Sequence, residues 1–112
     1  MSKEELVHLI GDVIAELSML GADPDITASH KKIIDALRDA LDDQQLTVAR
    51  LAFKEKTKDY KDATSKLQDI NKSIQNTIND IDNLINTVKS VTQLIGIIDT
   101  VIGLGTKLAG AG

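Results

Sequence analysis

Residues 65–104 decide the fold, and they read SKLQDINKSIQNTINDIDNLINTVKSVTQLIGIIDTVIGL. Aliphatic side chains recur through this stretch at alternating spacings of three and four residues, and Thr77 is the one polar member of the series. Such a heptad repeat is typical of a helix that packs along one face against other helices. The apolar members of this seam are Leu67, Ile70, Ile74, Ile81, Leu84, Val88, Val91, Ile95, Ile98 and Ile102.

Read as one helix, residues 65–104 would be about 60 Å long at a rise of about 1.5 Å per residue. The helix predicted at the N-terminus would reach only about 27 Å at the same rise. It is too short to cover the seam alone. We therefore expect one of two arrangements: the two helical segments before the seam join into a second long rod beside it, or another subunit covers it.

The distribution of glycine and proline favours helices throughout. Pro24 is the single proline, and no glycine or proline lies between Asp25 and Ile95. A sheet would need tight turns such as Asn-Gly or Asp-Gly, which this stretch lacks. The sequence therefore predicts an all-α fold, in which a helical hairpin and a long heptad-patterned C-terminal helix form an antiparallel helical bundle or a coiled-coil assembly.

The first helix has a recognisable start and stop. Ser2 and Glu5 fit a capping box, in which each side chain satisfies a free backbone N–H of the other. Gly21 is suited to end the helix in the left-handed conformation. Asp23 and Pro24 are then expected to be the N-cap and the first residue of the second helix, which would fold back against the first.

We expect one domain over residues 1–112, with an N-terminal helical hairpin over 1–43, a long helical segment over 44–104 and a flexible tail over 105–112. Residues 54–59 contain no apolar side chain, so a bend is expected either there, within 54–60, or at the polar residues within 42–46.

Composition excludes several classes of function. The chain has 112 residues, a formal net charge of -4, no cysteine and 2% aromatic residues. A nucleic-acid-binding domain is usually basic, and base stacking needs aromatic side chains. The absence of cysteine removes disulfides, thiolate metal sites and cysteine nucleophiles. We expect no nucleic-acid partner, no small-molecule substrate and no cofactor.

No arrangement of residues indicates catalysis or a metal site. Glu5 and His8 form the Glu-x-x-His pair of four-helix di-iron proteins, with Asp12 one turn further on, but Thr27 stands where a second glutamate would precede His30. No nucleophile elbow or phosphate-binding loop is present. The sequence predicts a protein that is not an enzyme.

Charge and apolar character are distributed unevenly. A candidate basic patch occupies the middle of the chain and consists of Arg50, Lys54, Lys56, Lys58, Lys61 and Lys66. It is suited to an acidic partner or anionic lipid, although the simplest interpretation is a solvated helix face.

The C-terminal residues 91–111 combine eleven hydrophobic residues with four glycines, and Gly96, Gly103 and Gly110 recur every seven positions. Small residues on one side of a helix permit close approach of another helix, in water or in lipid. Over these twenty or so residues the chain resembles, in a general way and without a diagnostic motif, the apolar glycine-containing heads of helical pore-forming toxins.

These observations predict a non-enzymatic module for protein–protein interaction and assembly, which self-associates into a homo-oligomer or pairs with another helical chain along the seam. The alternative is a membrane-active helical protein that uses the apolar C-terminal segment. No signal sequence precedes the first helix, so we expect a cytoplasmic location, with signal-independent export as the alternative.

Overall fold

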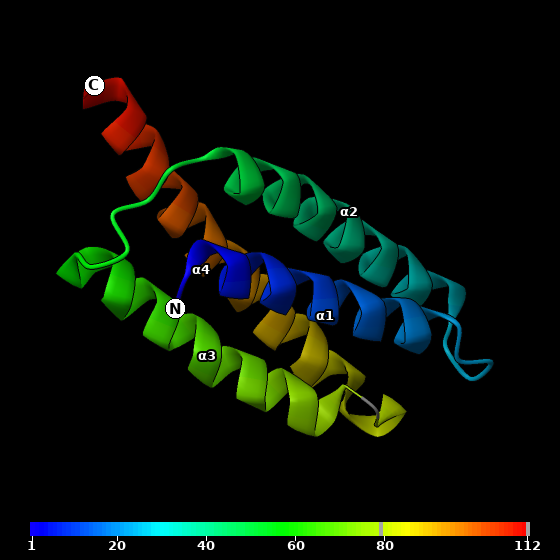
Figure 1. The fold of residues 1–112 in the computed structure, drawn as a ribbon. Helices are drawn as coiled ribbons and strands as arrows, with labels where there is room; N and C mark the ends of the chain where they lie inside the picture. The colour runs from blue at the N-terminus through cyan, green and yellow to red at the C-terminus, as the bar shows by residue number, and fades with distance from the viewer. Residues whose placement is uncertain (79, 112) are drawn as a thin grey trace.

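Helices form over most of the segments in which apolar residues recur every three and four positions. In this computed structural model, which describes residues 1–78 and 80–111 and side chains up to residue 106, the chain is an all-α bundle (Figure 1). The all-α bundle expected from the sequence is confirmed. Its elements are α1 (Lys3–Gly21), α2 (Ala28–Arg50), α3 (Lys58–Thr77), the short 3₁₀ turn η1 (Ile81–Asn83) and α4 (Leu84–Ala111).

Side-chain caps set where the helices begin. The predicted capping box is confirmed: Ser2 Oγ accepts from the N–H of Glu5 at 3.1 Å, and the Ser2 N–H donates to the Glu5 carboxylate at 3.4 Å. Thr27 caps α2 and Thr57 caps α3 in the same way, each accepting from the N–H three residues on. Each cap satisfies a backbone donor that the first helical turn leaves without a partner.

The connection between α1 and α2 differs from the expectation. Asp23 does not cap α2, because its side chain accepts the N–H of Asp25 at 2.9 Å and holds a turn, and Pro24 lies in that turn. α1 does end at Gly21, but no described residue has a left-handed backbone; the N–H of Ala22 instead bonds back to carbonyls of the last turn. The loop is therefore longer than predicted.

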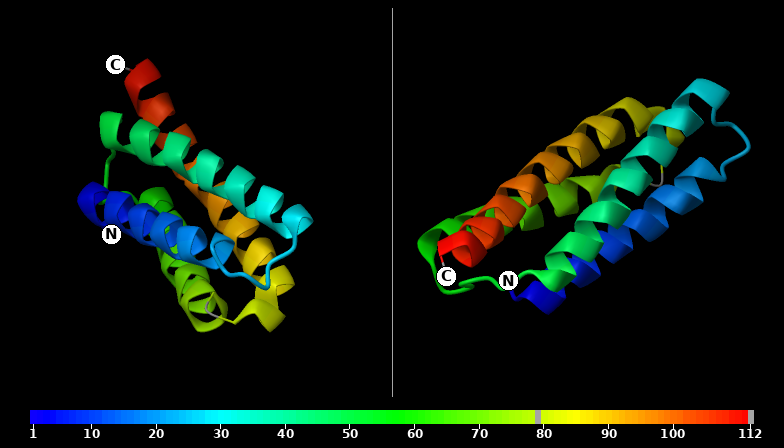
Figure 2. Two further views of the ribbon diagram at one scale, coloured as in Figure 1. Left: turned by 90° about the vertical axis from the view of Figure 1, so that its right-hand side faces the viewer. Right: turned by 90° about the horizontal axis from the view of Figure 1, so that it is seen from above.

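The helices form two antiparallel hairpins, α1–α2 and α3–α4, packed side by side (Figures 1 and 2). Between the hairpins, α2 packs along α4 in the same direction, whereas α1 and α3 touch at only a few positions. The molecule measures 49 × 22 × 18 Å.

The chain crosses the end of the bundle between α2 and α3. α2 runs without interruption through 42–46, so the bend lies instead in the loop 51–57, which overlaps the expected range 54–60. This crossing loop passes over the starts and ends of other helices: Lys3 donates its backbone N–H to Glu55 at 2.8 Å and its ammonium to the carbonyl of Leu51 at 3.1 Å. A loop rich in lysine and without a continuous apolar face remains outside the core.

The expected continuous helix over 65–104 is divided. α3 ends at Thr77, and Asp80 caps η1 by accepting the N–H of Asp82 at 3.0 Å. Across this turn the hydroxyl of Thr87 donates to that of Thr77 at 3.0 Å. The seam consequently folds back on itself, and its two halves cover each other without a second subunit. α4 then continues to Ala111, through most of the residues expected to form a flexible tail; Gly112 lies outside the described residues.

Candidate interaction surfaces

The predicted interaction seam lies inside the protomer. Five of its ten residues are buried and the other five are half-buried. The buried ones are Leu67, Ile74, Leu84, Val91 and Ile98; the half-buried ones are Ile70, Ile81, Val88, Ile95 and Ile102. Ile81 falls in η1 rather than in a long helix. Except for Ile81, these side chains belong to the hydrophobic core or pack against it, so the seam as a whole is not free to bind a partner.

The buried side of α4 is rotated from the predicted seam. The positions of α4 that face the core include Thr87, Leu94 and Val101, each 0% exposed, in addition to Leu84, Val91 and Ile98. They repeat with the same alternating spacing of three and four residues. Because α4 packs against both α2 and α3, its buried stripe is centred between the two, rather than on either helix.

A buried glutamine joins α2 to α4 inside this apolar interface. Gln44 is 6% exposed, and its amide Nε2 donates to the carbonyl of Ile95 at 2.9 Å and to the carboxylate of Asp99 at 2.8 Å. A buried amide that finds partners at only one position specifies how two helices align. We infer that Gln44 fixes the register of α2 on α4.

All six residues of the basic patch are exposed, and they surround one end of the bundle. They lie at the end of α2, on the crossing loop and on the first turns of α3, beside the C-terminal part of α4 (Figures 1 and 2). Glu55, which interrupts the patch, is turned inward to accept from the N-terminus of α1. Asp59 and Asp62 remain exposed among the lysines.

Phe53 seats the crossing loop on α4. Its ring centre lies 5.6 Å from that of Tyr60, and the ring covers Gly105 so closely that a Cβ added there would lie 2.6 Å from a ring carbon. The same added Cβ would lie 3.2 Å from Leu51. A side chain at 105 would therefore force Phe53 to shift, so close packing favours glycine there, although its backbone is helical.

Tyr60 is buried beside this contact. Its side chain is 1% exposed, and within the described residues its hydroxyl oxygen has no hydrogen-bond partner. Burial, and then the nearby carboxylates of Glu55, Glu4 and Glu5, raise the pKa of the Tyr60 phenol to about 12. Both causes disfavour the tyrosinate anion.

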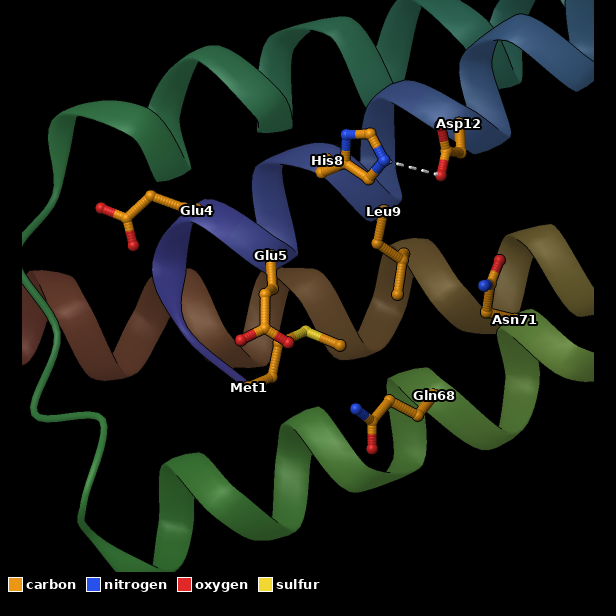
Figure 3. A pocket seen from close by; sticks show the side chains of 8 residues that line it. All are labelled: Met1, Glu4, Glu5, His8, Leu9, Asp12, Gln68 and Asn71. Atoms are coloured by element: carbon orange, nitrogen blue, oxygen red, sulfur yellow. Dashed lines mark ion pairs between the residues drawn. The ribbon is translucent and has the colours of Figure 1, made fainter.

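A groove of about 480 Å³ separates α1 from α3 where these helices barely touch (Figure 3). Met1 and Leu9 give it apolar walls, Gln68 and Asn71 line its α3 side, and Glu4, Glu5 and Asp12 make its α1 side acidic. His8 is 81% exposed and pairs with Asp12 at 3.4 Å, whereas Glu5 extends toward α3 (Figure 3). Glu5 and His8 therefore do not converge. Among the residues that the structure describes, no three carboxylates, histidines or cysteines gather closely enough to hold a metal ion.

The outward side of α4 carries a second heptad stripe, of which the sequence had indicated only Gly96 and Gly103, as small positions that permit close approach of another helix. All six of its positions are exposed, and Ile85 is 76% exposed. We call this surface the outer stripe; it consists of Ile85, Lys89, Thr92, Gly96, Asp99 and Gly103. Its spacing of four, three, four, three and four residues was readable in the sequence, but the stronger aliphatic seam beside it dominated the pattern.

α4 is also apolar along its length. Among the described residues, Ile81–Thr106 is the one segment long and apolar enough to cross a membrane, and 28% of its most apolar stretch is buried in the bundle. Core helices of soluble proteins pass the same test, although they are mostly buried.

No protein-family model, no curated protein and no solved structure matches the chain. What these surfaces do has to follow from their chemistry.

Replacing glycine by alanine should change the stability in opposite directions at two positions of α4. Gly105→Ala should destabilise the protein, because the new methyl group collides with Phe53 and Leu51. Gly103→Ala should stabilise it by up to about 1 kcal/mol, because nothing lies within 4 Å of the added Cβ and alanine favours the helix. Denaturant unfolding at low protein concentration should separate the two variants by about 1–3 kcal/mol. Equal stabilities would show that Phe53 does not press on α4.

Tyr60→Phe tests the buried phenol. Below pH 10 the variant should be at least as stable as the wild type, because it loses a buried hydroxyl without a partner. Between about pH 10 and pH 12 the wild type should lose stability, since the unfolded tyrosine ionises near its ordinary pKa and the folded one only at about 12. The variant should lack this portion of the alkaline loss, which is on the order of 2–3 kcal/mol. Urea unfolding between pH 8 and pH 12 measures it; identical alkaline curves would contradict the assignment.

Proposed function

We propose that this protein is a non-enzymatic assembly module that binds another helix along the outer stripe of α4. The observation that carries the proposal is the state of Gly96 and Gly103: both are exposed in the interior of a long helix, and nothing lies within 4 Å of a Cβ added to either. An exposed glycine in a helix costs about 1 kcal/mol relative to alanine. Packing within the protomer gives no reason for that cost.

A helix without side chains at two positions one heptad apart lets a second helix come close. The neighbouring threonines support this use of the surface. Thr92 donates its hydroxyl to the carbonyl of Val88 at 2.8 Å, and Thr100 donates to that of Gly96 at 3.2 Å. Because their hydroxyls are already bonded to the helix itself, a helix partner would not leave them unsatisfied. The exposed apolar side chain of Ile85 extends the same surface.

Membrane docking is a second candidate, favoured by the charge at one end of the bundle. Residues 50–66 hold six basic and three acidic side chains, a net charge of +3 on a chain whose total is -4. The acidic side chains Asp23, Asp25, Asp80 and Asp82 lie in the two loops at the opposite end. The half-buried Leu104 of α4 lies beside Lys66 in a shallow hollow at the basic end. Asp59 and Asp62 line the same hollow, so the support for an anionic bilayer surface is the net positive charge of residues 50–66 beside the apolar α4.

The assembly proposal predicts that the wild type exceeds its 12.1 kDa monomer mass in light scattering and that Gly96→Leu and Gly103→Leu reduce it to the monomer. Leucine favours the helix, and its Cβ at either position has nothing within 4 Å in the protomer, so helicity by circular dichroism should be unchanged. Ala36→Leu, on the exposed side of α2, is the matched control and should keep the assembly. A wild type that stays monomeric up to millimolar concentration, or leucine variants that assemble normally, would refute the proposal.

The membrane candidate predicts co-sedimentation with vesicles that contain phosphatidylglycerol, but not with neutral phosphatidylcholine vesicles. Lys54→Glu with Lys56→Glu should weaken binding by about 30-fold or more, because each basic residue near an anionic surface contributes about 1 kcal/mol. Lys31→Glu with Lys32→Glu makes the same charge change at the opposite end and should have little effect. Absence of sedimentation at low salt would remove this candidate.

A further inference from the structure

The outer stripe is complementary to itself when its direction is reversed. Its bulkiest apolar member, Ile85, stands at one end, and the bare Gly103 stands at the other. Its basic residue, Lys89, and its acidic residue, Asp99, lie at matching distances from the middle. Thr92 and Gly96 likewise lie at matching distances on either side of the middle. The two members of each pair lie equally far from the middle of the stripe. One twofold axis perpendicular to α4 would therefore bring each residue opposite its counterpart in a second copy.

A second copy of α4, laid antiparallel along the stripe, would therefore form six layers over about 27 Å. In each outer layer the side chain of Ile85 enters the space left by the partner's Gly103. In the next layer Lys89 meets the opposite charge of the partner's Asp99, and at the centre Thr92 packs on the partner's Gly96. This arrangement places large side chains against small ones and basic side chains against acidic ones, which favours one register of an antiparallel helix pair.

The charged side chains of the stripe are available for such a pair. Both are exposed, and Lys89 has no ion-pair partner among the described residues. Asp99 is held in place by the bond that its Oδ1 accepts from Gln44. That bond turns one carboxylate oxygen toward Gln44 and so holds the Asp99 side chain in one orientation.

Partly exposed aliphatic groups run beside the stripe, toward α2. Val88, Ile95 and Ile102 are half-buried, and they too repeat at a spacing of seven residues. In the reversed arrangement this row would meet its own copy, with Ile95 nearest to the twofold axis. The pair would thus bury apolar surface that the protomer leaves in water.

We propose that the partner of this face is a second copy of the same chain, bound antiparallel through the outer stripe, with Lys89 of each copy paired with Asp99 of the other. This inference rests on the proposed assembly function and names its partner and register. A twofold arrangement uses each pair twice, which doubles the effect of every residue in it.

Charge reversal tests the register. Lys89→Asp places two aspartates opposite each other twice in the dimer, and Asp99→Lys does the same with lysines. Each variant alone should dimerise about tenfold more weakly than the wild type. An equimolar mixture of the two should recover wild-type affinity, because both layers then pair opposite charges. The double variant, which exchanges the two charges within one chain, should recover it as well. Analytical ultracentrifugation gives the affinities, and thermal melting checks that loss of the Gln44 bond leaves Asp99→Lys folded.

Cross-linking gives the same information without relying on energies, since the chain has no cysteine. Ile85→Cys and Gly103→Cys both lie at exposed positions. Under mild oxidation a mixture of the two should form a disulfide-linked dimer, and neither variant alone should do so.

The outcomes separate this inference from the function on which it rests. A monomeric wild type refutes both. A dimer whose charge variants are not rescued by mixing, or in which Ile85→Cys links to itself, keeps the assembly function and refutes the antiparallel register.

Discussion

α4 is packed from two sides at once, and the rest of the architecture depends on that contact. Val91, Leu94, Ile98 and Val101 are fully buried between α2 and α3. Because α1 and α3 scarcely touch, the contact of α4 with α2 is what joins the hairpin α3–α4 to the hairpin α1–α2. Burying these four aliphatic side chains contributes roughly 6–12 kcal/mol in gross terms, which is comparable to the whole stability of a small domain. Gln44 then selects one alignment among those that apolar packing alone would allow.

The sequence predicted what local chemistry controls. The capping box at Ser2 lay in the right place, and the polar run after Phe53 indicated the break between α2 and α3. The turn after Thr77 escaped detection because the aliphatic spacing continues through it without a change of phase. The interruption comes from Asp80, whose side chain bonds the backbone ahead of it and so competes with a continuing helix. Only the packing of α3 against α4 shows that the turn capped by Asp80 prevails over a continuing helix.

The candidate surface could be predicted only in part, for a related reason. Periodicity finds aliphatic residues that repeat, and it cannot tell whether the chain itself covers them. The row through Ile74, Val91 and Ile98 is covered from within, because the chain turns back on itself. Gly96 and Gly103 were visible as a heptad of small residues, but their exposure follows from which side of α4 meets α2 and α3. A surface of this kind is defined by what the fold leaves uncovered.

Tyr60 has a practical consequence for optical spectroscopy. It is the one tyrosine of a chain without tryptophan, and it lies against Phe53 where the crossing loop rests on the helices. Near-ultraviolet circular dichroism and intrinsic emission of this protein therefore arise almost entirely from a single ring at that junction. Far-ultraviolet dichroism, by contrast, averages over every helix. Recorded together during unfolding, the two signals would reveal whether the loop detaches before the helices melt, with no label attached.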